Sequence, residues 1–217
     1  MTPKEESSAA SMAETWTQEV LSELVFGIAH QIRNPLSIIR STDILSHRLK
    51  ELLDFTHPLE LNLKNCLPQE LIEPSLPLIR ERCSHQKIQI EKSYPQRPRA
   101  IRADPDRLQE ALLQIILNAI EAMPEGGKLS LRVSQPPSSR TTSFQISDTG
   151  CGIPLEQLKD VVRPFFTTKH GSSGLGLSLA KKIFDAHQGC LKIENAPGKG
   201  TTVMGEIGRE AASRPQR

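Results

Sequence analysis

The spacing of apolar residues along residues 69–207 constrains the fold of this 217-residue chain more than any other feature. Segments in which apolar and polar residues alternate, as in a half-buried strand, are interleaved with segments in which apolar residues recur every three or four positions, as in an amphipathic helix. The alternating segments are 87–93, 128–134, 143–147, 190–195 and 201–207, and the helical ones are 69–84, 106–122 and 175–187. Because regular strand–helix–strand repeats are absent from this order, we predict an α/β sandwich, in which one mixed sheet carries helices on one face.

Turn and capping residues mark the ends of several of these elements. Asp104-Pro105 is typical of a helix start, with Asp as the cap and Pro at the first helical position. Gly189 closes the last helix, whereas Pro74 and Pro77 predict that the helix over 69–84 is bent or interrupted.

A second, helical region is predicted over residues 15–57, so the fold class is α+β overall. Apolar residues recur at helical intervals up to Ile39 and resume out of step at Leu45, which indicates a break or a change of packing partner near residues 41–43. His57-Pro58 ends this region. The predicted organisation is a disordered tail over 1–14, the helical region over 15–57, a linker over 58–68, the sandwich domain over 69–207 and a disordered tail over 208–217.

Charge and cysteine usage exclude several classes of partner. The net charge of +2 is too small to favour nucleic acid or an anionic membrane surface. The four cysteines lie far apart and lack the spacing of metal ligands, which favours a reduced, cytoplasmic compartment. No apolar run reaches the length of a membrane span and no signal peptide is visible, so we expect no membrane segment in this chain.

His30 lies on the polar face of its helix. It is two residues from both Ile28 and Ile32, so it points about 200° away from the apolar seam, and Asn34 shares its face. The simplest interpretation is a solvated histidine on a surface helix. Other parts of the chain must decide whether this imidazole carries chemistry.

The helix over 106–122 carries a polar stripe. Glu110, Gln114 and Asn118 follow one another at four-residue intervals on an otherwise apolar helix. Asn118 is flanked by apolar residues, so its amide lies near the edge of the buried face and could hold a metal ion through its carbonyl oxygen. A solvated stripe is the alternative.

The string DTGCGIP, residues 148–154, directly follows a predicted strand. Its glycines allow backbone to approach a ligand closely, and Asp148 is placed to accept a hydrogen bond from an exocyclic amine such as that of adenine. A tight turn with an Asx cap would also account for this string.

Two further glycine-rich stretches accompany it. Gly171, Gly174 and Gly176 precede a helix N-terminus, where free N–H groups and the helix dipole bind phosphate. The stretch is not a Walker A loop, because no Gly-Lys-Ser/Thr closes it. The second stretch, GKGTT over 198–202, would by itself be an ordinary hairpin turn.

Taken together, these motifs resemble those of bacterial two-component sensor histidine kinases. AHQIRNPL (29–36) resembles the phosphoacceptor box and LLQIILNAIEAM (112–123) the asparagine box. DTGCGIP, PFFTTK, GLGLS and GKGTT resemble the first glycine box, the phenylalanine box, and the second and third glycine boxes. The resemblance covers nearly all of residues 20–207, and the Pro-Phe-Phe-Thr-Thr-Lys string is most similar to the nitrogen-regulatory branch.

The resemblance implies a Bergerat (GHKL) type of ATP site. Asp148 would bind the adenine amine, Asn118 and Gln114 would hold Mg²⁺, and residues 153–173 would form a mobile lid. The further ligand contacts that it implies come from Gly150, Gly152, Lys169, Gly174, Leu175, Gly176 and Thr201.

His30 would then be the nucleophile that takes the γ-phosphoryl group of ATP. The phosphoryl group would pass to an aspartate on the receiver domain of a response regulator. Asn34 resembles the position that orients water for the reverse, phosphatase activity, and residues 15–57 would form a homodimer.

Three departures from the family pattern leave alternatives open. Gln31 stands where a general-base Glu is common, and Gln114 stands where a second Asn is usual. From His30 to Phe55 the chain spans only about 38 Å if wholly helical, too short for a two-helix hairpin. We expect the chain to be a sensor histidine kinase that phosphorylates itself on His30, and the alternatives are a non-catalytic ATP-binding module or mainly a response-regulator phosphatase.

Overall fold

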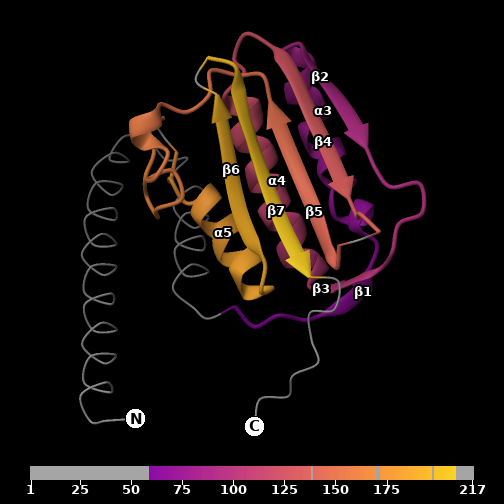
Figure 1. The fold of residues 1–217 in the computed structure, drawn as a ribbon. Helices are drawn as coiled ribbons and strands as arrows, with labels where there is room; N and C mark the ends of the chain where they lie inside the picture. Colours follow the sequence, from indigo (N-terminus) through magenta and orange to yellow (C-terminus); the bar gives the residue numbers. More distant parts are fainter. Residues whose placement is uncertain (1–58, 138, 170–171, 197, 209–217) are drawn as a thin grey trace, which may run out of the picture. The chain divides into compact units, whose positions relative to one another are not determined.

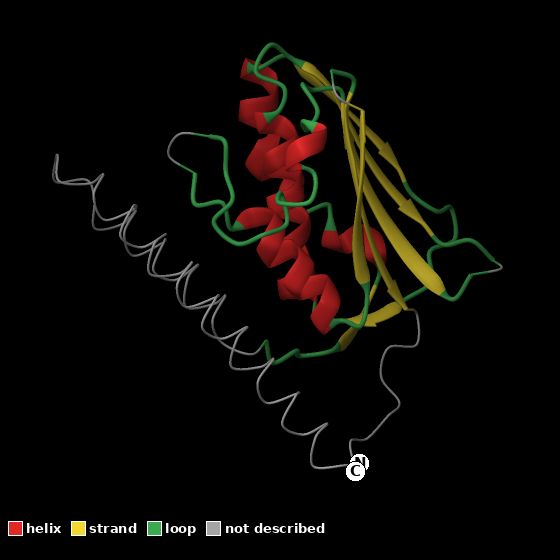
Figure 2. Cartoon of the chain, turned by 60° about the vertical axis from the view of Figure 1, so that its left-hand side comes forward, coloured by secondary structure: helices red, strands yellow, loops and turns green. Residues whose placement is uncertain are grey.

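The computed structural model describes residues 59–137, 139–169, 172–196 and 198–208, and the predicted helical region over 15–57 lies outside them. All described residues belong to one compact unit, Phe55–Arg217. Figures 1 and 2 show its two layers, a five-stranded sheet and a layer of helices on one face of that sheet. None of the helices in these ranges combines the length and the apolar character that crossing a membrane would need.

The main sheet is mixed, as predicted. Its strands, in spatial order, are β2 (Ile88–Ser93), β4 (Gly127–Ser134), β5 (Thr141–Asp148), β7 (Gly200–Gly208) and β6 (Cys190–Ala196). The pair β2–β4 is parallel and the other three pairs are antiparallel. One consequence of this order is that β5 and β7, which carry the glycine-rich strings at their ends, lie side by side in the centre of the sheet.

Three helices cover one face of this sheet: α3 (Ser75–His85), α4 (Pro105–Glu121) and α5 (Gly176–Ala186). Helix α4 begins as predicted, with the Asp104 carboxylate accepting a hydrogen bond from the Arg107 N–H at 3.1 Å and Pro105 at its first position. Seven residues of α4 are buried, and they pack with buried residues of α5 and of the sheet into a single core. The core therefore fixes the position of α4 against the centre of the sheet.

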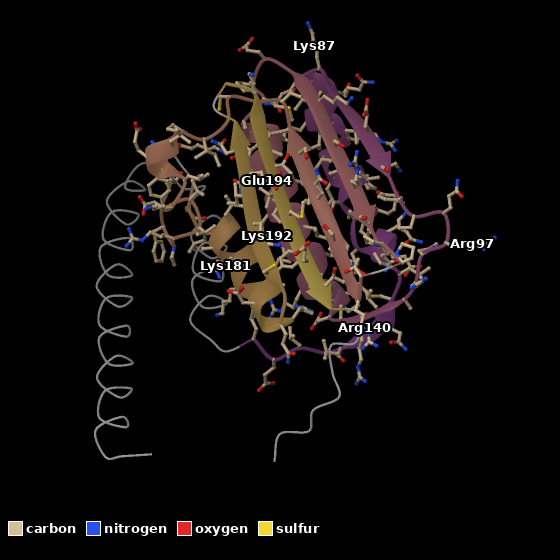
Figure 3. All side chains as sticks on the ribbon, viewed as in Figure 1. Lys87, Arg97, Arg140, Lys181, Lys192 and Glu194 are labelled. Atoms are coloured by element: carbon tan, nitrogen blue, oxygen red, sulfur yellow. The ribbon has the colours of Figure 1, made fainter. Side chains whose placement is uncertain are left out.

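The opposite face of the sheet is polar. Along β5 the buried residues alternate with half-exposed ones, and Lys192 and Glu194 of β6 are exposed on the face turned toward the viewer in Figure 3. Lys192 pairs with Glu206 of the neighbouring strand at 2.8 Å. On the helical face, the Phe144 and Phe184 rings lie 6.4 Å apart, and Gly205 leaves the space for Phe184 that a Cβ atom would occupy.

Short elements depart from the predicted pattern. The predicted linker over 58–68 contains β1 (Lys64–Cys66), which pairs antiparallel with β3 (Ile101–Ala103), and neither strand was expected. The expected interruption near Pro74 is confirmed, since a 3₁₀ turn, η1 (Pro68–Leu71), and a turn precede α3. A second 3₁₀ turn, η2 (Leu155–Gln157), was not predicted, and Gly208 is the last residue of β7 rather than the start of a tail.

Candidate functional site

The predicted metal and phosphate residues come together where α4 and α5 cross. Gly176 begins α5 and lies against the polar stripe of α4. A Cβ atom on Gly176 would lie 2.9 Å from Gln114 Oε1 and 3.3 Å from Asn118 Nδ2. Because a side chain at position 176 would meet both amides, glycine keeps the start of this helix open to them.

Asp148, the predicted base-binding carboxylate, is the last residue of β5 and is 9% exposed. Its Oδ1 accepts hydrogen bonds from the backbone N–H groups of Gly150 at 2.9 Å and Thr201 at 3.2 Å. Within the described ranges no group donates to Oδ2, so this oxygen keeps its capacity to accept a ligand hydrogen bond.

The electrostatics of Asp148 reflect its burial. Burial raises the pKa of this carboxyl above its ordinary value, whereas the two backbone N–H donors and Lys169 lower it in part. A carboxylate that the fold holds at such a cost, with one oxygen free, is typical of a binding site.

The glycines around Asp148 and α4 permit close approach of backbone to backbone. A Cβ atom on Gly150 would collide with the carbonyl oxygen of Ala122, and one on Gly200 would collide with the carbonyl oxygen of Asp148. Gly200 also has a φ of +106° and Gly174 a φ of +68°, which favour glycine. Gly150 thus brings the loop after β5 against the C-terminal end of α4, and Gly200 brings the start of β7 against the backbone of Asp148.

Asn195 of β6 is a site residue that sequence reasoning missed. Its Oδ1 accepts from the Ile153 N–H at 2.7 Å, and its Nδ2 donates to the Ile153 carbonyl at 2.6 Å. Thr201 Oγ1 donates to the same Oδ1 at 3.4 Å. The signal was its position in the strand, because alternation assigns Asn195 to the side of the sheet that Ile193 turns to the core.

Lys169 lies at the end of the described segment 153–169. Its Nζ donates to Glu121 Oε2 at 2.7 Å, and Glu121 Oε1 in turn lies 3.6 Å from Arg82 Nη2 of α3. Glu121 was not predicted as a site residue, although it follows Asn118 by three positions on the same helix face. Within the same segment Phe165 has a φ of 65°, a strained conformation for a non-glycine residue.

A buried polar cluster lies at the other end of α4. Asp104 Oδ2 accepts from the Asn62 N–H at 2.8 Å, and the Asp104 N–H donates to His187 Nε2 at 3.0 Å. His187 Nδ1 lies 2.8 Å from the Ile183 carbonyl, so the ring is neutral, with its proton on Nδ1. Burial lowers the pKa of His187 accordingly.

The donor set fits Mg²⁺ only together with a ligand that supplies oxygens. Across the described ranges no group of three or more His, Cys, Asp or Glu side chains could hold a metal by itself. Gln114 and Asn118 offer amide oxygens, which suit Mg²⁺ when phosphate oxygens and water complete an octahedral shell.

The predicted catalytic residues His30, Gln31 and Asn34 lie outside the described residues. The structure brings the predicted site residues together in two groups. The first group is Gln114, Asn118 and Gly176, and the second is Asp148, Gly150 and Thr201.

In comparison with known proteins, residues 103–209 match the model of the family of histidine kinase-, DNA gyrase B- and HSP90-like ATPases. Over 215 residues the chain is 30% identical to the signal transduction histidine-protein kinase AtoS of Escherichia coli, covering 88% of this chain and 35% of that protein. It is 31% identical to the sensor histidine kinase ZraS of Salmonella typhimurium, covering 83% of this chain and 44% of ZraS. The chain thus spans less than half the length of these relatives.

Solved structures show the same fold. The nucleotide-free catalytic domain of the histidine kinase ThkA superposes with a TM-score of 0.63 at 29% identity, over 69% of this chain and 97% of that domain. ThkA in complex with the response regulator TrrA superposes with a TM-score of 0.73 at 24% identity, over 92% of this chain and 65% of that one.

Proposed function

We propose that this chain, which belongs to the sensor histidine kinases of two-component systems, binds Mg–ATP at the cluster around Asp148. It then transfers the γ-phosphoryl group of ATP to His30. The observation that carries the proposal is the state of Asp148. Two backbone N–H groups hold one of its oxygens, and its other oxygen is left to accept from a ligand amine.

Each part of the cluster has a separate role in this proposal. Asp148 Oδ2 would accept from the adenine amine, and Gln114 and Asn118 would supply oxygens to Mg²⁺. The N–H groups at the start of α5, reached through Gly174 and Gly176, meet the phosphates. When bound, Mg²⁺ draws negative charge from the phosphate oxygens.

The transfer itself needs a neutral imidazole. A ring nitrogen of His30 attacks the γ-phosphorus, the bond from phosphorus to the bridging oxygen breaks, and ADP leaves with the electron pair. Gln31 cannot usefully accept the imidazole proton, so in this proposal the proton leaves to water. Catalysis then rests on positioning and charge stabilisation rather than on a general base beside His30.

The phosphoryl group then passes to an aspartate of a response-regulator receiver domain. The complex of ThkA with TrrA supports this type of partner for the present chain. A homodimer through residues 15–57, a cytoplasmic location, the 153–173 lid and membership of the nitrogen-regulatory branch complete the proposal. These rest on the motifs, the apolar spacing and the cysteine usage of the sequence.

Incubation with ATP labelled at the γ-phosphate tests the function. We expect acid-labile, alkali-stable label that is absent from His30→Ala and strongly reduced in Asp148→Asn, with His85→Ala as the control for an exposed histidine that plays no part. ATP binding without label would point to a non-catalytic module. Loss of phosphate from a regulator aspartate, sensitive to Asn34→Ala, without labelling of the chain would point to a phosphatase.

A further inference from the structure

One ion pair joins the described part of the predicted lid, residues 153–169, to the helix layer. Lys169 Nζ lies 2.7 Å from Glu121 Oε2 on the last residue of α4. The other ion pair in this described segment, Arg163 with Asp160 at 2.9 Å, is internal to it. The contact between Lys169 and Glu121 is therefore the electrostatic link between the segment and the ligand-bearing helix.

The location of this contact matters for the ligand. Glu121 follows Asn118 by three residues on α4, so its carboxylate lies one turn from the predicted Mg²⁺ ligand. The charge of Lys169 also helps to lower the pKa of Asp148, so the ammonium group is within electrostatic reach of the base-binding carboxylate. Lys169 thus pairs with Glu121 and acts electrostatically on Asp148 as well.

We propose that Glu121 is a positioning residue that holds Lys169 when no nucleotide is bound, and that nucleotide binding exchanges the Glu121 carboxylate for phosphate oxygens at Lys169. This inference rests on the proposed function, because it concerns the same ligand. It adds a residue that the family motifs did not single out, and it assigns Lys169 two successive partners.

The strength of the contact suits such an exchange. The Lys169 and Glu121 side chains are 41% and 31% exposed, and ion pairs with this exposure are weak because water competes for both charges. A nucleoside triphosphate with its Mg²⁺ still carries more negative charge than one carboxylate and offers several oxygens to the ammonium group. The phosphates can therefore displace Glu121 at small cost.

Arg82 remains near the Glu121 carboxylate after the exchange. Its Nη2 lies 3.6 Å from the other oxygen of Glu121, so Glu121 keeps a cationic neighbour when Lys169 leaves. The negative charge of Glu121 is then partly balanced next to the incoming phosphates. Competition for Lys169, rather than repulsion by Glu121 alone, is what limits nucleotide affinity.

A double-mutant cycle on nucleotide affinity tests this inference. A non-hydrolysable ATP analogue with Mg²⁺ is titrated against the full chain, Glu121→Gln, Lys169→Gln and the double variant. We expect Glu121→Gln to tighten binding about two- to fivefold, the range set by an exposed ion pair. In the Lys169→Gln background the same change should tighten binding less, since no lysine remains to be released.

Removal of a negative charge could by itself favour an anionic ligand, and the cycle separates this effect. Equal or greater tightening in the Lys169→Gln background would overturn the inference in favour of simple repulsion. Weaker binding by Glu121→Gln in the full chain would overturn it as well, because Glu121 would then support the bound state. Glu73→Gln, which breaks a similarly exposed ion pair with Lys92 outside the predicted lid, is the matched control and should leave the affinity unchanged.

Amide hydrogen exchange gives a readout that needs no nucleotide. In the nucleotide-free protein, Glu121→Gln should speed exchange in peptides that contain residues 164–169, whereas Asp160→Asn should act only near its own turn. Unchanged exchange at 164–169 would contradict the proposed contact. If the unsubstituted chain fails to bind the analogue at all, the proposed function fails, whereas binding with unaltered affinity in Glu121→Gln refutes only the role of Glu121.

Discussion

The two ends of helix α4 hold their polar groups in opposite ways. At the N-terminal end Asp104 is 5% exposed and both of its carboxylate oxygens accept backbone N–H groups, from Arg107 and Asn62. Beside the C-terminal end, Asp148 is nearly as buried, yet only Oδ1 has donors among the described residues. Complete hydrogen bonding stabilises a fold, whereas an oxygen without a donor, on a carboxylate that is otherwise buried, is available to a ligand.

The largest effect on stability is expected from Asp104→Ala. The change removes the cap of α4 and takes the acceptor away from the N–H of the exposed residue Asn62, so the free energy of unfolding should fall by about 2 kcal/mol. Denaturant unfolding measures it. Asp106→Ala, two residues away and exposed, is the control and should cost less than about 0.5 kcal/mol. Equal losses of unfolding free energy in the two variants would show that the hydrogen bonds of Asp104 do not stabilise the N-terminal end of α4.

Asp148→Asn should instead change stability little and nucleotide affinity strongly. Because burial raises the pKa of Asp148, the fold disfavours its charged form, and a neutral amide that keeps an oxygen for Gly150 and Thr201 should leave stability within about 1 kcal/mol. Nucleotide affinity should fall about tenfold or more, because a hydrogen bond to a charged acceptor is lost. Calorimetric titration and unfolding of the same preparation measure both quantities. A stability loss as large as that of Asp104→Ala would show that Asp148 serves the fold.

The same contrast explains how far the sequence predicted the structure. Helix α4 and strands β4 to β7 were predicted because apolar spacing, caps and turn residues all agree over eight or more residues in most of them. Strands β1 and β3 have three residues each, too few to show alternation, and they pair only with each other. Their existence depends on a contact between segments 35 or more residues apart.

In the site, local strings predicted Asp148, Asn118 and Gly176, and the structure places them around one end of α4. Asn195 was missed because its partner Ile153 lies 42 residues away along the chain, and outside the site His187 was missed because its partner Asp104 lies 83 residues away. Neither partner can be read from spacing. The available signal was a polar residue at a position that faces the core, and such residues predict site and cluster positions as glycine-rich strings do.

Stability should also depend on pH through His187. Burial lowers the pKa of this ring, so the proton binds the unfolded chain more readily than the folded one. The contribution is therefore fully present above the unfolded value of about 6.5 and is lost as pH falls below it, by at most about 1.4 kcal/mol per pH unit. Asp104 is the charged neighbour, and its carboxylate opposes the shift in part.

Unfolding free energies measured between pH 7 and pH 5 check this expectation. The slope should be smaller in His187→Gln and unchanged in His85→Gln, whose imidazole is exposed. A slope that persists in full without His187 would assign it to another group. Nucleotide affinity need not follow the same curve, because His187 lies at the end of α4 opposite to Asp148.

The smallest expected effect is that of Glu121→Gln on stability, below about 0.5 kcal/mol, because both side chains of its contact with Lys169 are partly exposed and screened by water. Unfolding in denaturant without nucleotide measures it, with Arg82→Gln as the matched change at the other partner of Glu121. A loss above about 1 kcal/mol would mean that this end of α4 is also built for the fold, and the contrast between the two ends would fail. A negligible loss of stability, combined with a change in nucleotide affinity, would sharpen that contrast. Glu121 would then contribute to ligand exchange and not to folding, as expected at the end of α4 where polar groups lack part of their hydrogen bonds.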